Sequence, residues 1–264
     1  MIEVQVNGVP LPSWLGVKRH DIPALPETKD YNIQIPGRDG EIDFGMDYGP
    51  RTFNLECIIM ADNPTTDYQA KVAELATIFN AKRGDMEFIF SDRPGIRYVA
   101  RYAGQMPIDK LIFDGNVTIP LKMHWPFPES QHDTRAREYG QGLEYGQGYE
   151  YSTHAILVTA SSQLIPIQHD GTYQVAPFIR ITGAFTNLSL SDGLNTFTFT
   201  GTNGPNDVIE IDSKQFTVKK NGVNAYGQTN GVFFLLKPGT TSFICNSTNP
   251  DFKIEFIFRH TYLY

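Results

Sequence analysis

The chain has 264 residues and a net charge of −7, with 22 Lys and Arg against 29 Asp and Glu, and it carries two cysteines. A chain of this length can bury one large or two ordinary hydrophobic cores, so it needs neither a disulfide nor a metal to fold. The acidic balance argues against a nucleic-acid-binding groove, because affinity for phosphates is built mainly from Lys and Arg contacts.

The N-terminal segment MIEVQVNGVP has neither a basic region nor a long apolar run, so the sequence predicts no secretory signal. The longest apolar run, VFFLL at residues 232–236, is far shorter than the roughly 20 residues that cross a bilayer. We therefore expect a soluble chain that is made in the cytoplasm and has no membrane partner.

Several short runs in the first half alternate apolar and polar residues, which predicts antiparallel strands with one solvent-facing side. These runs are IEVQV at 2–6, YNIQI at 31–35, RTFNLECIIM at 51–60, MEFIF at 86–90 and IRYVARY at 96–102. Turn signals such as Asn7-Gly8 separate them. The half closes with NVTIPLKMHWPFPE at 116–129, a last strand that Pro126 and Pro128 end.

One helix is predicted between the third and fourth of these strands, over residues 66–84. Its apolar side chains at i, i+4, i+7 and i+11 share one helix face: Tyr68, Val72, Leu75 and Phe79. Thr66 and Gln69 have the spacing of a capping box, and Gly84 stands where an αL cap belongs. This order of strands around a single helix predicts an α+β domain rather than a doubly wound nucleotide-binding fold.

From residue 155 onward the sequence has no helical pattern, only short apolar runs at about ten-residue spacing, which predicts an antiparallel β-sandwich. The runs are AILV, PFIRITG, FTNLSL, TFTFTG, DVIEID, QFTVKKNG, GVFFLLKPG, TSFIC and FKIEFIFRH. The predicted fold is therefore mainly β. We expect an α+β domain at residues 1–133, a Gly/Tyr-rich connector at 134–152 and the sandwich at 153–264.

The connector contains the repeat REYGQGLEYGQGYEY at residues 137–151. Its glycines Gly140, Gly142 and Gly146 are one residue out of register with the dinucleotide fingerprint, and no strand precedes or helix follows them, so we expect no nucleotide site. The repeat also holds four tyrosines: Tyr139, Tyr145, Tyr149 and Tyr151. Such an aromatic strip predicts an ordered connector that packs against one or both domains.

No catalytic or metal-binding constellation is visible. The six histidines, at positions 20, 124, 132, 154, 169 and 260, do not fall at metal-ligand spacing, so each is expected to be solvated or hydrogen-bonded. Cys57 and Cys245 each lie in an apolar run and are expected to be core thiols. The sequence therefore predicts no catalytic residue, no cofactor and no metal, and a protein that is not an enzyme.

Two other functions stay open. Aromatic side chains could bind a sugar, but Trp14 and Trp125 both lie in the first half, and the phenylalanines of the predicted strands have the pattern of core residues. These are Phe197, Phe199, Phe233, Phe234, Phe256 and Phe258. A carbohydrate-binding adhesion module is thus the alternative function, and a carboxylate pair that cleaves a glycosidic bond is the third.

The order of parts resembles the distal tail proteins of long-tailed, non-contractile bacteriophages. The run IQIPGRDGEIDFG at 33–45, the strand RTFNLECIIM, the single helix, MEFIF and DRPGIRYVARY are similar to the N-terminal domain of that family. The YGxG segments, PFIRITG, IEID, FFLLKPG and FKIEFIFRH are similar to its linker and galectin-like C-terminal domain.

The resemblance implies a structural virion protein of the tail tip. It implies a homo-hexameric ring that joins the tail tube protein to the tip or baseplate, where a fibre or lysin and a receptor-binding protein carry out host adsorption. DNA would pass through the ring without specific binding. The sandwich would be a docking platform for neighbouring tail proteins.

Overall fold

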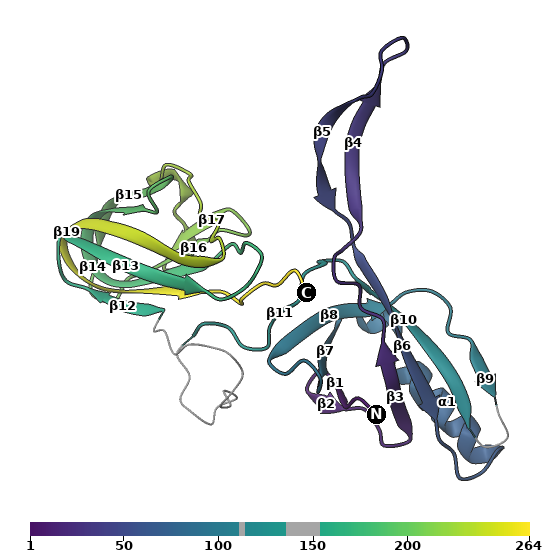
Figure 1. Ribbon diagram of the computed structural model, residues 1–264. Helices are drawn as coiled ribbons and strands as arrows, with labels where there is room; N and C mark the ends of the chain where they lie inside the picture. The colour runs from purple at the N-terminus through teal and green to yellow at the C-terminus, as the bar shows by residue number, and fades with distance from the viewer. Residues whose placement is uncertain (111–113, 136–153) are drawn as a thin grey trace. The chain divides into compact units, whose positions relative to one another are not determined.

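The computed structural model describes residues 1–110, 114–135 and 154–264. Within it, contacts divide the chain into two compact units, which Figure 1 shows. The first comprises Met1–Glu129 and Leu263–Tyr264, and the second comprises Ser130–Tyr262. The limits expected for the connector stay a prediction, because most of it lies outside the described residues.

Among the described residues, the main sheet of the first unit is built from nine strands. They are β1 (Val4–Val6), β2 (Val9–Pro10), β3 (Leu15–His20), β6 (Arg51–Ile59), β7 (Met86–Phe90), β8 (Ile96–Tyr102), β9 (Ile108–Lys110), β10 (Gly115–Met123) and β11 (Glu129–Ser130). The order is β2-β1-β7-β8-β10-β6-β3, with β9 beside β10 and β11 beside β8. Strands β4 (Thr28–Gln34) and β5 (Glu41–Tyr48) form a separate hairpin. Each run predicted as a strand in this half lies wholly or partly in one.

The helix of the first unit is α1 (Thr66–Ile78), where the periodicity predicts it. Tyr68, Leu75 and Phe79 are buried in the core, and Val72 packs against it partly buried, so the predicted helix face is confirmed. The Phe79 ring stacks on the Phe88 ring of β7, with 6.4 Å between centroids. Burial of this face stabilises the helix more than its own propensity does.

Both ends of α1 differ from the prediction. The helix begins at Thr66, so Thr66 is not the N-cap residue and the predicted capping box is wrong. Thr65 is the N-cap residue; it makes no side-chain capping bond, and its hydroxyl donates to Asn63 Oδ1 at 2.7 Å. The helix ends at Ile78, and a separate 3-10 turn, η1 (Ala81–Arg83), follows it. Gly84 ends that turn, with φ +87° and ψ −156°, and does not form the predicted αL cap of the helix.

The second unit is an eight-stranded antiparallel structure within the described residues. Its strands are β12 (Ala155–Val158), β13 (Ser162–His169), β14 (Phe178–Ser191), β15 (Thr196–Asn203), β16 (Val208–Asp212), β17 (Thr217–Lys220), β18 (Val223–Asn224) and β19 (Gly239–Ile257), with a 3-10 turn η2 (Tyr226–Gln228). The order is β12-β19-β14-β16-β17-β18, with β13 beside β19 and β15 beside β14.

The long strands β14 and β19 pair with each other and contribute to both sides of this unit. Residues 178–182 of β14 pair with β16, and residues 185–191 pair with β15. In the same way, β19 pairs first with β13 and then with β12. Bulges between Ala184 and Leu188 interrupt the central pairing, so one pair of strands can bend around the buried core.

Three details of the second half correct the expectations. PFIRITG and FTNLSL are one strand, β14, and TSFIC and FKIEFIFRH both belong to β19. GVFFLLKPG is no strand up to Pro238, and its last residue, Gly239, begins β19. Phe234 and Leu236 are buried, but before Gly239 the backbone pairs only through a bridge from Leu236 to Val175. The sequence pattern does not predict strand β13. The mainly-β fold class is confirmed, and Cys57 and Cys245 are buried free thiols, as expected.

Candidate functional site

The hairpin β4–β5, here called the arm (Thr28–Tyr48), has an apolar face exposed to solvent. Ile33 lies opposite Ile42, and Tyr31 and Phe44 follow on the same face. Tyr31, Ile33 and Phe44 are 49%, 54% and 63% exposed. The alternation in YNIQI predicts a strand with one solvent-facing side, but every residue of β4 is exposed. Figure 1 shows the arm standing away from the other strands of its unit.

The arm also has two unpaired edges. Strands β4 and β5 pair only with each other in the described part of the chain. A lone two-stranded hairpin is marginally stable in water, and a free edge is a template for another strand. Gly45, at φ +94°, allows a bulge in the arm, where its N–H donates to Asp43 Oδ1 at 2.7 Å. The arm therefore has the properties of an element that a further protein surface covers.

Arg51 fixes the base of the arm. The residue is 1% exposed, and its guanidinium donates to the carbonyl oxygens of Pro23 at 3.2 Å and Leu263 at 2.5 Å. Burial lowers the pKa of Arg51 from its ordinary value. The Gly49 N–H donates to Glu27 O at 2.7 Å. The chain that enters the arm and the chain that leaves it are thus tied together.

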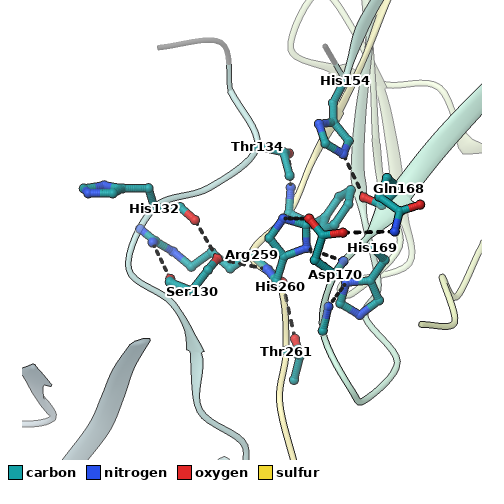
Figure 2. A network of polar contacts seen from close by, with 12 residues as sticks. Ser130, His132, Thr134, His154, Gln168, His169, Asp170, Arg259, His260 and Thr261 are labelled. Carbon is teal, nitrogen blue, oxygen red and sulfur yellow. Dashed lines mark hydrogen bonds and ion pairs between the residues drawn. The ribbon is translucent and has the colours of Figure 1, made fainter. Parts of the chain in front are cut away.

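Three histidines of the second unit, distant in sequence, meet in a buried cluster that Figure 2 shows. The rings of His169 and His260 are nearly parallel, with 5.5 Å between centroids and 3.2 Å between their Nδ1 atoms. The His154 ring lies 6.3 Å from that of His260. Asp170 Oδ2 lies 3.7 Å from His260 Nε2, so one carboxylate faces the cluster.

The hydrogen bonds favour neutral imidazoles. Backbone N–H groups of Asp170 and Gly171 donate to Nδ1 of His260 and His169, at 3.0 and 3.3 Å. His169 Nε2 lies 2.6 Å from Tyr173 O, which assigns its proton to that nitrogen. Burial lowers the pKa of His169, and it lowers the pKa of His260 to about 4 although Asp170 opposes this.

The same cluster anchors the segment that precedes residue 136. The Ser130 N–H donates to His260 O at 2.7 Å, and the His260 N–H donates to Ser130 Oγ at 3.0 Å. The Thr134 hydroxyl donates to Phe256 O at 2.7 Å and accepts from the Phe258 N–H at 3.1 Å. Figure 2 shows Ser130 and Thr134 near the labelled His260. The cluster is therefore part of the framework of the second unit.

In the described ranges, no group of three or more His, Cys, Asp and Glu side chains could hold a metal ion. His20 pairs with Asp92 at 2.9 Å, and His124 Nε2 lies 2.6 Å from Arg101.

In the part of the chain that the structure describes, no helix has the length and apolar character needed to span a membrane. The Gly/Tyr repeat at 137–151, with its predicted ordered packing, lies outside the described residues.

A polar pocket of about 450 Å³ lies on the outer side of β14, β16 and β19. Arg180 is directly opposite Glu210 on one neighbouring strand and Glu255 on the other, and it donates to Glu210 at 3.0 Å. Thr182 and Asn221 also line the pocket. The Arg180 side chain is 40% exposed, although its Nε is buried and has no hydrogen-bond partner among the described residues.

Comparisons with known proteins match both units. The model of the "phage tail protein RIFT-related domain" family matches residues 13–123, and that of the "siphovirus-type tail component, C-terminal domain" family matches residues 170–262. No curated protein matches the chain.

Among solved structures, the crystal structure of the Dit protein of phage SPP1, described as a paradigm of the hub adsorption apparatus in phages infecting Gram-positive bacteria, matches with a TM-score of 0.73. The match is 16% identical and covers 98% of this chain and 99% of that one. A chain of the phage P2 baseplate in its activated, calcium-bound conformation matches at 8% identity over 97% of this chain and 98% of that one, with a TM-score of 0.41.

The two family models lie in the order that the resemblance implies, and together they span most of the chain. The SPP1 protein shares its fold over nearly the full length of both chains. The chain therefore belongs to the distal tail protein family of siphophages, whose members are structural proteins of the phage tail.

Proposed function

We propose that the chain forms a closed homo-hexameric ring that joins the tail tube to the tip or baseplate and lets DNA pass through its centre. The observation that carries this proposal is the exposed arm. An apolar face with exposed Tyr31, Ile33 and Phe44 costs free energy in water, and burial against a second subunit removes that cost.

A head-to-tail ring needs two different, complementary surfaces on each subunit. The arm supplies one of them, with an apolar face and two free edges. Its fixed base at Arg51 limits the directions in which it can reach, which lowers the entropy lost on association. The arm of one subunit lies on the body of the next, and six repeats close the ring.

The charge distribution supports the channel. Residues 1–133 carry 13 Lys and Arg against 19 Asp and Glu, whereas the remaining residues carry 9 against 10. Carboxylates at a channel wall repel DNA phosphates, so the duplex slides and does not adhere. A ring structure with a basic lumen would contradict this part of the proposal.

The ring acts by holding other proteins and catalyses no reaction. Its partners are the tail tube protein on one side and, on the other, the tip or baseplate proteins, including a fibre or lysin and a receptor-binding protein. The second unit is a docking platform at the periphery. The assembled location is the tip of the virion tail, after assembly in the host cytoplasm.

A mass measurement in solution tests whether the arm forms the contact between subunits. The wild-type chain should elute with a mass of about six subunits in size-exclusion chromatography with light scattering. The double variant Ile33→Asn/Phe44→Asn should elute as a monomer, because both side chains are exposed within one chain and are buried only in the ring. Fluorescence of Trp14 and Trp125 should show that the first unit stays folded.

The matched control is Val9→Asn, which removes a side chain that is 65% exposed on β2 of the same unit. This variant should keep the wild-type mass. A double variant that still forms the ring, or a wild-type chain that is a monomer at high concentration, would contradict the role of the arm.

The pocket at Arg180 favours a second candidate function, the binding of a neutral carbohydrate. A guanidinium that is partly exposed between two carboxylates can donate to one sugar hydroxyl while a carboxylate accepts from its neighbour. The volume of about 450 Å³ is within the range of small-ligand pockets.

Retention of the full chain on purified host cell-wall polysaccharide tests this function. Arg180→Gln should weaken retention about tenfold, because hydrogen bonds to a charged group are lost. Lys237→Gln, which removes one positive charge outside the pocket, should leave retention unchanged. Equal retention of the two variants, or none by the wild type, would exclude the pocket as a sugar site.

A further inference from the structure

Phe216 has a backbone conformation that its residue type disfavours. Five non-glycine residues in the described ranges have positive φ, and four of them are asparagines: Asn7, Asn187, Asn221 and Asn249. The fifth is Phe216, at φ +55°. Asparagine tolerates this left-handed region, whereas a bulky side chain is strained there. At the other four positions the chain uses the tolerant residue, so Phe216 is an exception that needs a reason.

The turn itself does not require phenylalanine. Phe216 follows β16 in the turn that leads to β17, where Asp212 Oδ1 accepts the N–H groups of Lys214 and Gln215, both at 2.9 Å. These bonds come from the aspartate, so asparagine at position 216 would suit the turn better than phenylalanine does. The core does not require it either, because Phe216 is 66% exposed. Neither the turn nor the core therefore accounts for a phenylalanine at position 216.

The Phe216 ring belongs to a continuous group of rings on the surface. Phe216 meets Phe233 edge-on, with 5.3 Å between centroids and an 86° angle. Tyr226 stacks on Phe233, with 6.3 Å between centroids and a 20° angle. Phe233 packs against the core, while Tyr226 is 46% exposed. We call Phe216, Tyr226 and Phe233 the aromatic patch; its partly buried member, Phe233, contacts both exposed rings.

The segments that carry the aromatic patch also carry exposed lysines. Lys214 lies in the turn with Phe216, Lys219 pairs with Asn224 just before Tyr226, and Lys237 follows the segment of Phe233. Asp212, the nearest carboxylate in the first of these segments, accepts two backbone N–H groups. The surroundings are thus predominantly cationic. Phe216 is 66% exposed, so most of its ring can insert into a pocket on a protein surface.

We propose that the aromatic patch docks another protein of the tail tip, whose surface has an apolar socket for Phe216 bordered by carboxylates. Aromatic anchors are typical of the energetic centres of protein interfaces, and opposite charge at the border directs association. The identity of the partner as a tail component rests on the proposed function, but the site and its chemistry rest on the second unit alone.

A crosslinking experiment in assembled tails tests the docking. p-Benzoylphenylalanine replaces Phe216 in phage made from the genome that encodes this chain, and mass spectrometry identifies the crosslinked peptides after irradiation. The matched control replaces Leu194, which is 82% exposed in another turn of the same unit. Position 216 should crosslink to a different tail protein, and position 194 should not. Crosslinks only within the chain, to polysaccharide, or equally from both positions would overturn the proposal.

The variant Phe216→Asn separates docking from folding. It should raise the unfolding temperature of the purified chain, because it relieves the strained backbone, and it should weaken docking about tenfold or more. Leu194→Asn should do neither. Light scattering separates the proposed ring from the proposed docking site. Phe216→Asn should keep the mass of the hexamer while docking is weakened, whereas a chain that forms no ring would contradict the proposed function and not the aromatic patch. A destabilised Phe216→Asn chain, or unchanged docking, would overturn the inference.

Discussion

Replacement of Gly183 by alanine is expected to lower the free energy of unfolding of the second unit by about 4 kcal/mol. Gly183 lies in β14 opposite Phe252 of β19, at φ +126°. A Cβ at this position would lie 2.5 Å from Asp251 O and 2.6 Å from Phe252 Cα. Both are backbone atoms of the neighbouring strand, so the longest strand pair of the unit must separate. Backbone strain adds to this steric cost.

Gly193→Ala is the matched control. Gly193 also has a positive φ, +87°, but no atom lies within 4 Å of the place that a Cβ would take, so the variant meets backbone strain without a clash. Hydrogen exchange of β14 and β19 peptides should report the difference between the two variants. Fluorescence of Trp14 and Trp125, both in the first unit, should not change. Equal destabilisation by the two substitutions would show that close strand approach is unimportant.

The position of Gly183 also explains why the sequence pattern misplaces strand boundaries. PFIRITG ends at Gly183 and only Ala184 separates it from FTNLSL, so the glycine marks the end of one run in the pattern. In the structure the chain continues as β14, and the glycine permits close approach and a bulge. Local pattern predicts which residues are extended. It does not distinguish a bend within a strand from a turn between two strands, because long-range pairing with β19 decides that.

The first unit shows a similar limit. The period of the apolar residues predicts α1 and its buried face, since both depend on the helix alone. The alternation in YNIQI predicts an amphipathic strand, and Ile33 and Ile42 do share one face of the arm. In the described structure, Ile33 and Phe44 on that face are exposed. A sequence pattern therefore predicts that a surface is apolar, but not whether the chain or a partner buries it.

The histidine cluster has no local signal in the sequence. His154, His169 and His260 are contributed by separate segments, and the fold brings them together across β12, β13 and the end of β19. The pattern misses Phe216 for a related reason: a phenylalanine in the run QFTVKKNG has the pattern of a strand residue, and its positive φ is visible only in the structure. Sites made by tertiary contact or by an unusual backbone angle require coordinates.

Acidification from pH 7.5 to 4.5 is expected to destabilise the second unit selectively. Above the ordinary histidine pKa of 6.5, His169 and His260 are neutral in both the folded and the unfolded chain, so the full stability is present. Below 6.5 the unfolded chain takes up protons that the folded cluster excludes, because burial lowers both pKa values. The loss grows as pH falls toward the folded pKa of His260, about 4, and reaches about 3 kcal/mol for that residue.

The variant His260→Asn tests the origin of this loss. Its side-chain oxygen can still accept from the Asp170 N–H, as His260 Nδ1 does at 3.0 Å, but it cannot take up a proton. Its free energy of unfolding should fall less between pH 6.5 and 4.5 than that of the wild type, as measured by hydrogen exchange of β13 and β19 peptides. His124→Asn, an exposed site in the first unit, should keep the wild-type pH profile of the second unit. If His260→Asn kept that profile as well, the acid sensitivity would come from carboxylates elsewhere, and the neutral histidine cluster would not control it.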